Sequence, residues 1–309
     1  MSTSGLLARA IDFAALGRPL HLVGGAIFYG LGVAAAGYAG AALAWQAALL
    51  GLLAVATAQL MNHYSNDYFD LEADRANRTP TRWSGGSRVL AEGRLPAHAA
   101  LVAALSFGVL ALGFAVLAAL VAPAPAATLI LFVFAIGLAW VYSGPPLYLH
   151  RRALGELAGG LIVPGLTALV GYQLQAGTIG SLALLAVLPL CLLQFAMLVA
   201  VNFPDAAGDA AVGKITLVVG IGPERAARLY MAAVGLAYAS LPLLGLLGLP
   251  WPVALAPLAT LPIAGWLALR VMKGAWRDPA AWDVLGFWSI GQLVGSAGLM
   301  LGAFALLAG

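Results

Sequence analysis

Residues 45–74 read WQAALLGLLAVATAQLMNHYSNDYFDLEAD, and the two parts of this stretch differ chemically. The part up to residue 65 is apolar and long enough to cross the hydrocarbon core of a bilayer, which takes about 20 helical residues. The part from Asn66 to Asp74 carries one carboxamide and four carboxylates. An apolar run that ends in such a cluster predicts a membrane helix with a functional group at one membrane surface.

Similar apolar runs recur along the whole chain. Besides 45–65, they fall at about 19–38, 97–121, 126–147, 153–172, 181–203, 226–248, 251–271 and 284–308. Because these runs lack the alternation of an outer-membrane strand, they predict an all-α, polytopic membrane protein with nine transmembrane helices. Residues 1–16 contain Arg9 and Asp12 and lack a long apolar core, so they predict a short interfacial helix.

The composition agrees with a membrane protein. Of the 309 residues, 62% are hydrophobic and 9% are charged, whereas soluble domains carry about 25% charged residues. The mean hydropathy is +0.97. These values exclude soluble globular, disordered and nucleic-acid-binding proteins, and the net charge of +3 indicates a biased membrane face rather than a DNA-binding surface.

The charges also predict an orientation. When successive connections are assigned to alternate faces, all 15 Lys and Arg residues fall on one side. The positive-inside rule then places the N-terminus in the cytoplasm, with the protein in the inner membrane and the C-terminus outside. All 12 acidic residues fall on the same side, although acidic residues follow no strong topological rule. Their position therefore predicts an active site at the cytoplasmic face.

Two carboxylate clusters follow the predicted second and sixth helices. Asn66, Asp70 and Asp74 are spaced by four residues, which places them on one helix face. The second cluster, spaced by three and then four residues, comprises Asn202, Asp205 and Asp209 and is followed by Lys214. Like charges at such spacing repel unless a cation lies between them.

The two clusters also suggest an internal duplication. Their aspartates are separated by 135 residues (70 to 205 and 74 to 209), and four predicted helices lie between them. This spacing predicts a single transmembrane domain over 1–309 built from two pseudo-repeats, about 18–150 and 151–280. Membrane proteins of this kind often form their site at the repeat interface.

Oxygen ligands without His or Cys favour Mg²⁺, which commonly joins one or two carboxylates to substrate phosphates. Two facing clusters would hold Mg²⁺ around one diphosphate, with nearby Arg and Lys side chains neutralising its remaining oxygens. One alternative is that these are ordinary solvated loop charges. A second is an ion-coupled transporter, but the middle stretches of the apolar runs carry no charge, which disfavours that alternative.

These motifs resemble those of the UbiA superfamily of intramembrane prenyltransferases. The first resembles the N-D-x-x-D-x-x-x-D pattern of that family, and the second resembles a D-x-x-x-D preceded by Asn and followed by G-K-x-T-L. The matching residues are Asn66, Asp67, Asp70 and Asp74, then Asn202, Asp205, Asp209, Gly213, Lys214, Thr216 and Leu217. The segment Tyr142–Leu147, the pair Gly155-Glu156 and the pair Arg18-Pro19 also resemble family motifs.

The resemblance implies nine helices around a central cavity with cytoplasmic cap loops, and a Mg²⁺-dependent transfer of a prenyl group from a polyprenyl diphosphate to an acceptor, often aromatic. By analogy the metal ligands are Asn66, Asp70, Asp74, Asn202, Asp205 and Asp209. The diphosphate is expected to contact Lys214 and some of Arg18, Arg75, Arg78, Arg82 and Arg88.

Three of the matching residues are expected to act in catalysis. Asp67 either orients a ligand or takes the acceptor proton, and Lys214 clamps phosphate. Tyr142 either stabilises an allylic cation or orients a substrate, although an interfacial-belt tyrosine is an equal alternative. Among the four histidines, only His63, one turn before Asp67, faces plausible chemistry, and there packing or a substrate hydrogen bond is expected rather than metal binding.

Within the family, the loop Trp83–Leu90 and the second motif look most like the 1,4-dihydroxy-2-naphthoate polyprenyltransferases of menaquinone-type quinone biosynthesis. The first motif departs from those enzymes because it lacks an extra residue between its aspartates. The acceptor therefore stays open, with 4-hydroxybenzoate, a porphyrin, a phospholipid or a sugar phosphate as alternatives.

Overall fold

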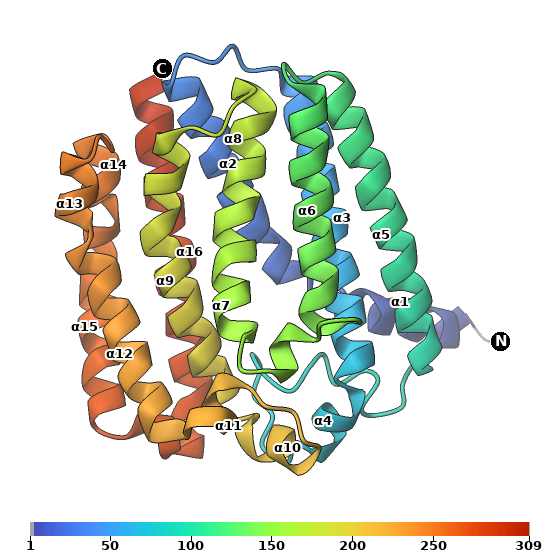
Figure 1. The fold of residues 1–309 in the computed structure, drawn as a ribbon. Coiled ribbons are helices and arrows are strands. Elements are labelled where there is room, and N and C mark those ends of the chain that lie inside the picture. The colour runs from blue at the N-terminus through green and yellow to red at the C-terminus, as the bar shows by residue number, and fades with distance from the viewer. Residues whose placement is uncertain (1–2, 309) are drawn as a thin grey trace.

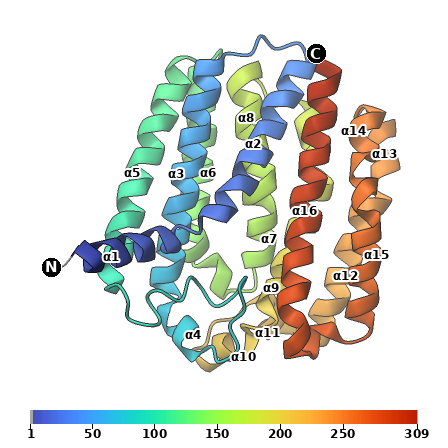
Figure 2. The same ribbon diagram turned by 180° about the vertical axis from the view of Figure 1, so that it is seen from behind.

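The computed structural model describes residues 3–308, and its helices stand side by side as one bundle (Figure 1). Helix α1 (Thr3–Leu16) lies across one end of the bundle (Figure 2). It carries the exposed side chains of Leu6, Leu7 and Ile11. A helix therefore covers most of the predicted interfacial segment, of which residues 1 and 2 lie outside the described part.

Nine helical stretches within residues 3–308 are long and apolar enough to cross a membrane. Five are single helices besides α2: α3 (Trp45–Phe69), α5 (Ala97–Leu120), α6 (Pro125–Ser143), α9 (Ser181–Asn202) and α16 (Pro279–Ala308). Helix α2 (Pro19–Tyr38) follows α1 after a break at residues 17 and 18, and the first stretch includes both helices. The other three are interrupted: α7 (Gly155–Gly160) with η2 (Leu161–Leu166) and α8 (Thr167–Ala176), α12 (Pro223–Ala239) with α13 (Leu241–Leu246), and α14 (Trp251–Leu255) with η3 (Ala256–Thr260) and α15 (Leu261–Met272). The prediction of an all-α polytopic fold is confirmed.

The helices α2 and α8 approach each other closely because glycines face the contact. A Cβ atom on Gly32 would lie 1.8 Å from the carbonyl oxygen of Ala168, and one on Gly171 would lie 2.4 Å from that of Tyr29. Helices in a bilayer gain little from burying apolar surface against each other, so close backbone packing through small residues stabilises their association.

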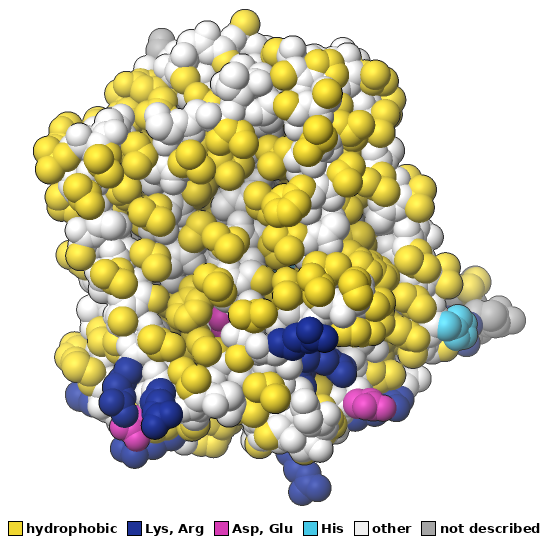
Figure 3. All heavy atoms as spheres, in the orientation of Figure 1, with side chains coloured by type: hydrophobic (Ala, Val, Ile, Leu, Met, Phe, Trp, Pro, Cys, Tyr) yellow, Lys and Arg dark blue, Asp and Glu magenta, His cyan; other side chains and the backbone are white. Residues whose placement is uncertain are grey.

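The charged end of the bundle carries short elements and a long loop. They are α4 (Leu71–Ala76), the loop 77–96, η1 (Leu149–Arg151), α10 (Ala206–Ala211), α11 (Leu217–Ile221) and η4 (Ala275–Arg277). In Figure 3 the Lys, Arg, Asp and Glu side chains of the visible face gather at this end, and apolar side chains cover the rest. We call these short elements and the loop 77–96 the cap. The cap carries charged side chains, which are absent from the middle of the apolar helices.

The fifth membrane stretch contains a distortion that its apolar sequence did not indicate. Its middle part, η2, is a π-helix with Pro164 inside it. Proline has no N–H to donate to the preceding turn, and one extra residue in the turn accommodates its ring. Just before this stretch, Arg152 pairs with Ile215 in a short parallel backbone bridge.

Candidate functional site

The two carboxylate clusters meet at the charged end of the bundle. The first runs from the end of α3 into α4, and the second runs from the end of α9 into α10. Helices α4 and α10 pack on each other, and a Cβ on Gly208 would lie 2.9 Å from the Cα of Asn77. The amide of Asn77 donates to Asp205 Oδ1 at 2.7 Å, so the residue after α4 holds an aspartate of the second cluster.

Lys214 connects the two clusters. Its Nζ lies 3.0 Å from Asp70 Oδ2 and 3.3 Å from Asp209 Oδ1, and the residue is only 9% exposed. Burial opposes its charge, but the two aspartates outweigh burial and raise the pKa of Lys214. For Asp70 burial is likewise outweighed, by Lys214 and His150, so its pKa is held well below its ordinary range. One buried ammonium is therefore the counter-ion of both motifs.

His150 is a site residue that the sequence did not indicate. Its Nε2 lies 2.7 Å from Asp70 Oδ1 and its Nδ1 lies 2.7 Å from the carbonyl oxygen of Tyr142, so the ring is clamped between two acceptors. His63 Nδ1 lies 2.8 Å from the carbonyl oxygen of Gly17, a contact that agrees with a packing role for this histidine.

Asp67 is fully engaged by protein groups. Its Oδ1 accepts from Arg18, and its Oδ2 accepts from the hydroxyl and the backbone N–H of Ser87. Arg18 Nη2 also lies 3.3 Å from Asn66 Oδ1. Because both carboxylate oxygens have partners, this geometry favours Asp67 orienting Arg18 and the loop over Asp67 taking a proton.

Asp74 lies against the loop 77–96. A Cβ on Gly86, which has φ +71°, would lie 2.1 Å from Asp74 Oδ2. Arg88 donates to the backbone carbonyl of Asp74. Burial, together with the nearby charges of Asp70 and Asp67, raises the pKa of Asp74 to about 8, against the opposing effects of Arg18 and Lys214. A cation beside Asp74 would favour the ionised form of this carboxyl group and lower its pKa.

Asp209 has a carboxylate oxygen that could bind a metal. It is 2% exposed, and its Oδ2 is buried without a hydrogen-bond partner in the described structure. Burial raises its pKa to about 7, and Asp205 and Asp70 also raise it against the effect of Lys214. Burial also raises the pKa of Asp205. The positive groups of the protein therefore do not fully offset the burial of these two carboxyl groups.

The donor set fits Mg²⁺ chemically. It consists of carboxylate and carboxamide oxygens, one of them the orphaned Oδ2 of Asp209. Within residues 3–308, no three His, Cys, Asp or Glu side chains are already gathered closely enough to hold a metal by themselves. Mg²⁺ usually takes one or two carboxylates together with substrate phosphates, so an incomplete protein cage is compatible with it.

Two other predicted site residues contact protein groups. Asn202 Nδ2 donates to Glu156 Oε1 at 2.7 Å, and the backbone N–H of Leu217 donates to the same oxygen at 3.0 Å. Glu156 is buried, and it was visible in the sequence only as part of the Gly155-Glu156 pair. The ring of Tyr142 stacks on His150 with centroids 5.7 Å apart, which places it beside Asp70's partner.

The predicted arginines divide into two groups. Arg18 and Arg88 contact the first motif, as described above. Arg75, Arg78 and Arg82 are exposed, and Arg82 lies over the Trp83 ring at 5.3 Å. The exposed three therefore do not meet the aspartates in this structure. Arg151, which was not predicted, lies 3.7 Å from Asp70 Oδ1.

The chain is similar to known membrane enzymes. The sequence profile of the UbiA prenyltransferase family matches residues 26–291. The chain is 33% identical to the 1,4-dihydroxy-2-naphthoate octaprenyltransferase of Mycobacterium tuberculosis (strain ATCC 25618 / H37Rv), over 74% of this chain and 76% of that protein. It is 24% identical to the protein of the same name from Bacillus subtilis (strain 168), over 58% of this chain, and it spans only 56% of that relative's length.

The fold is also similar to that of a solved structure, a UbiA homolog from Archaeoglobus fulgidus bound to DMAPP and Mg²⁺. The TM-score is 0.62 at 16% identity, and the match covers 94% of this chain and 99% of that chain.

Proposed function

The chain belongs to the UbiA prenyltransferase family, and on that premise we propose that it transfers a prenyl group from a polyprenyl diphosphate to an aromatic acceptor with Mg²⁺. It is an integral membrane protein, and we place its N-terminus and its site on the cytoplasmic side of the inner membrane because the charges gather at that end. The naphthoate-directed relatives support a dihydroxynaphthoate acceptor and a role in quinone biosynthesis.

One observation carries the proposal: carboxylates from two separate motifs converge on the buried ammonium of Lys214. Carboxylates that share a site repel one another, and a nearby cation favours their ionised form. The solved homolog bound to DMAPP and Mg²⁺ supports the same chemistry for the fold. Asp70, Asp74, Asp205 and Asp209, with Asn66 and Asn202, would hold the metal. When bound, Mg²⁺ would supply the positive charge that makes diphosphate a good leaving group.

The residues of the chain would then act on the diphosphate and the acceptor. Lys214, Arg18 and Arg88 would neutralise its oxygens, while Asp67 keeps Arg18 in place. In the reaction, the bond between the allylic carbon and the diphosphate oxygen breaks, and its electron pair leaves with diphosphate. An acceptor ring carbon supplies the pair for the new carbon–carbon bond, and its proton passes to the departing diphosphate, the base that the reaction itself supplies. The Tyr142 ring would face the developing allylic charge.

The test is an assay in membranes with a radiolabelled polyprenyl diphosphate. Dihydroxynaphthoate and 4-hydroxybenzoate are offered in parallel, with Mg²⁺ or with EDTA. We expect a lipid-soluble product from dihydroxynaphthoate that requires Mg²⁺. Product from 4-hydroxybenzoate alone would show that 4-hydroxybenzoate, and not dihydroxynaphthoate, is the acceptor. Diphosphate release without product would point to a porphyrin, phospholipid or sugar phosphate acceptor.

Substitutions tie the activity to the site. Asp70→Ala, Asp205→Ala and Asp209→Asn are expected to abolish turnover in folded protein. Glu224→Gln is the matched control because Glu224 is exposed and pairs only with Arg228 in the described structure. Normal turnover in the three site variants would refute the metal-site assignment. Folded protein that turns over no acceptor at all would favour the ion-coupled transporter.

A further inference from the structure

A pocket lies beside the first aspartate motif, on the side of Phe69. It has a volume of about 310 Å³ and is lined by Phe69, Tyr148, Arg151 and Arg152. We call it the Arg151–Arg152 pocket. It lies where the apolar surface of the helices gives way to charged side chains. Figure 3 shows basic side chains at this boundary on the visible face, over the segment that joins α6 to α7 in Figure 1.

The guanidinium of Arg151 is fixed in this pocket. Its Nη2 donates to the carbonyl oxygen of Phe69, and its Cζ lies 6.0 Å from the centroid of the Tyr148 ring. The rings of Phe69 and Tyr148 meet edge to face at 5.7 Å. The Nε of Arg151 is buried and has no hydrogen-bond partner among the described residues. The side chain as a whole is 32% exposed, so another part of the guanidinium can reach a ligand in the pocket.

The pocket also carries excess positive charge. The side chain of Arg152 is exposed, and no acidic group lies within ion-pair distance of it in the described part of the chain. Arg151 has only Asp70, at 3.7 Å, and that carboxylate already has Lys214 and His150 as closer partners. Within residues 3–308, the one acidic neighbour of these two guanidinium groups is thus Asp70, whose charge is already largely balanced by closer partners.

Exposed apolar side chains come immediately before and after this charge. Leu147 is 42% exposed, Leu154 is 46% exposed and Leu157 is 56% exposed. In a bilayer these residues would contact acyl chains while the arginines reach the phosphate level. A free anion would use the charges but not the apolar surroundings, so the ligand that matches both is an anionic lipid.

We propose that the Arg151–Arg152 pocket binds the phosphate of an anionic phospholipid. The phosphate accepts from the exposed parts of the Arg151 and Arg152 guanidinium groups, and the acyl chains lie along the exposed leucines. Basic pockets between membrane helices near the cytoplasmic surface are suited to such headgroups.

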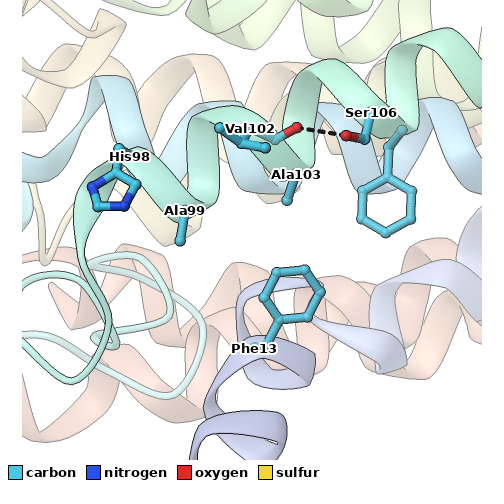
Figure 4. A pocket seen from close by; sticks show the side chains of 7 residues that line it. Phe13, His98, Ala99, Val102, Ala103 and Ser106 are labelled. Atoms are coloured by element: carbon cyan, nitrogen blue, oxygen red, sulfur yellow. Dashed lines mark hydrogen bonds between the residues drawn. The ribbon is translucent and has the colours of Figure 1, made fainter.

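A further pocket of the described structure lacks these features. It lies between α1 and α5, has a volume of about 380 Å³ and includes Phe13, Val102 and Ser106 in its lining (Figure 4). His98 is its one titratable side chain, and the hydroxyl of Ser106 donates to the carbonyl of Val102 at 2.9 Å. It therefore offers no pair of cations to a phosphate.

The test uses the full chain in detergent, offered equal amounts of phosphatidylglycerol and phosphatidylcholine with identical acyl chains. Native mass spectrometry measures the lipid retained on the protein. We expect phosphatidylglycerol to be retained roughly tenfold over phosphatidylcholine, because each arginine near an anionic headgroup contributes attraction. Arg152→Gln should remove most of this preference, and Arg228→Gln, at an exposed arginine elsewhere, should leave it unchanged.

Arg151→Gln also loses the contact with the Phe69 carbonyl, so Arg152→Gln, whose side chain holds no backbone group in the described structure, is the decisive variant. Equal retention of both lipids by the unaltered chain would overturn the proposal. So would an undiminished preference in folded Arg152→Gln. Displacement of phosphatidylglycerol by inorganic phosphate alone would indicate a free-anion site, and displacement by 4-hydroxybenzoate would indicate an acceptor site; either result refutes the lipid assignment.

Discussion

Replacing Lys214 by methionine keeps the length of the side chain and removes its charge. The ammonium lies 3.0 Å from Asp70 Oδ2 and 3.3 Å from Asp209 Oδ1. At an effective dielectric constant of about 20, each contact is worth about 5 kcal/mol before desolvation is subtracted. Loss of one partner of a buried ion pair costs about 3–5 kcal/mol, because the remaining charge stays buried without compensation. We therefore expect metal-free Lys214→Met to unfold at least about 6 °C lower than the unaltered protein.

The assay is thermal unfolding in detergent with EDTA at a pH near 8, where Asp209, with a pKa of about 7, is ionised. Lys273→Met is the matched control, because Lys273 is the other lysine of the chain and is exposed. Mg²⁺ should raise the unfolding temperature more in Lys214→Met than in the unaltered protein, since the metal becomes the counter-ion of both motifs. Equal unfolding temperatures of Lys214→Met and Lys273→Met in EDTA would refute the reasoning.

Three further predictions concern the same site. Burial raises the pKa of Asp74 to about 8 and that of Asp209 to about 7, so the folded, metal-free protein retains protons that the unfolded chain has lost. Its stability should therefore fall as pH rises from the ordinary aspartate pKa of 3.8 to about 8 and then level off, and Mg²⁺ stabilisation should grow over the same interval; thermal unfolding across that interval checks this, and a flat response contradicts it. Gly86→Ala and Gly93→Ala both force alanine to φ +71°, at about 1–2 kcal/mol each, but only the Cβ at 86 meets Asp74, at 2.1 Å, so only Gly86→Ala should weaken Mg²⁺ stabilisation. His150→Leu should lower turnover at least about tenfold because Asp70 loses its 2.7 Å partner, with partial rescue by His150→Gln; equal turnover in His150→Leu and the unaltered protein would exclude this role.

The apolar helices could be predicted from the sequence because bilayer thickness fixes their length and excludes charge from their middle. The two acidic motifs could also be placed at helix ends, since spacing by three or four residues is a local property. Asn66 and Asp70 do share a face, with the amide of Asn66 2.9 Å from Asp70 Oδ2. The assignment of these residues to metal stays a prediction.

Contacts between distant parts of the chain could not be predicted in the same way. His150 and Asp70 are 80 positions apart, and Lys214 and Asp70 are 144 positions apart. No periodicity relates such residues, because their meeting depends on how the cap folds over the bundle. The amide of Asn202 likewise turned to Glu156, a choice of rotamer that spacing does not determine.

The backbone bridge between the connection after α6 and the connection after α9 affects how much order the cap must gain when a ligand arrives. The N–H of Ala153 donates to the carbonyl of Ile215 at 2.6 Å, and the N–H of Ile215 donates to the carbonyl of Arg151 at 3.2 Å. These two hydrogen bonds fix the backbone of Ile215, the residue next to Lys214. A long ammonium side chain loses much conformational entropy when it is immobilised, and here part of that entropy is already lost during folding. The preorganised cation leaves more of the interaction energy for binding, and these two amides should exchange their protons with solvent only when the cap as a whole opens.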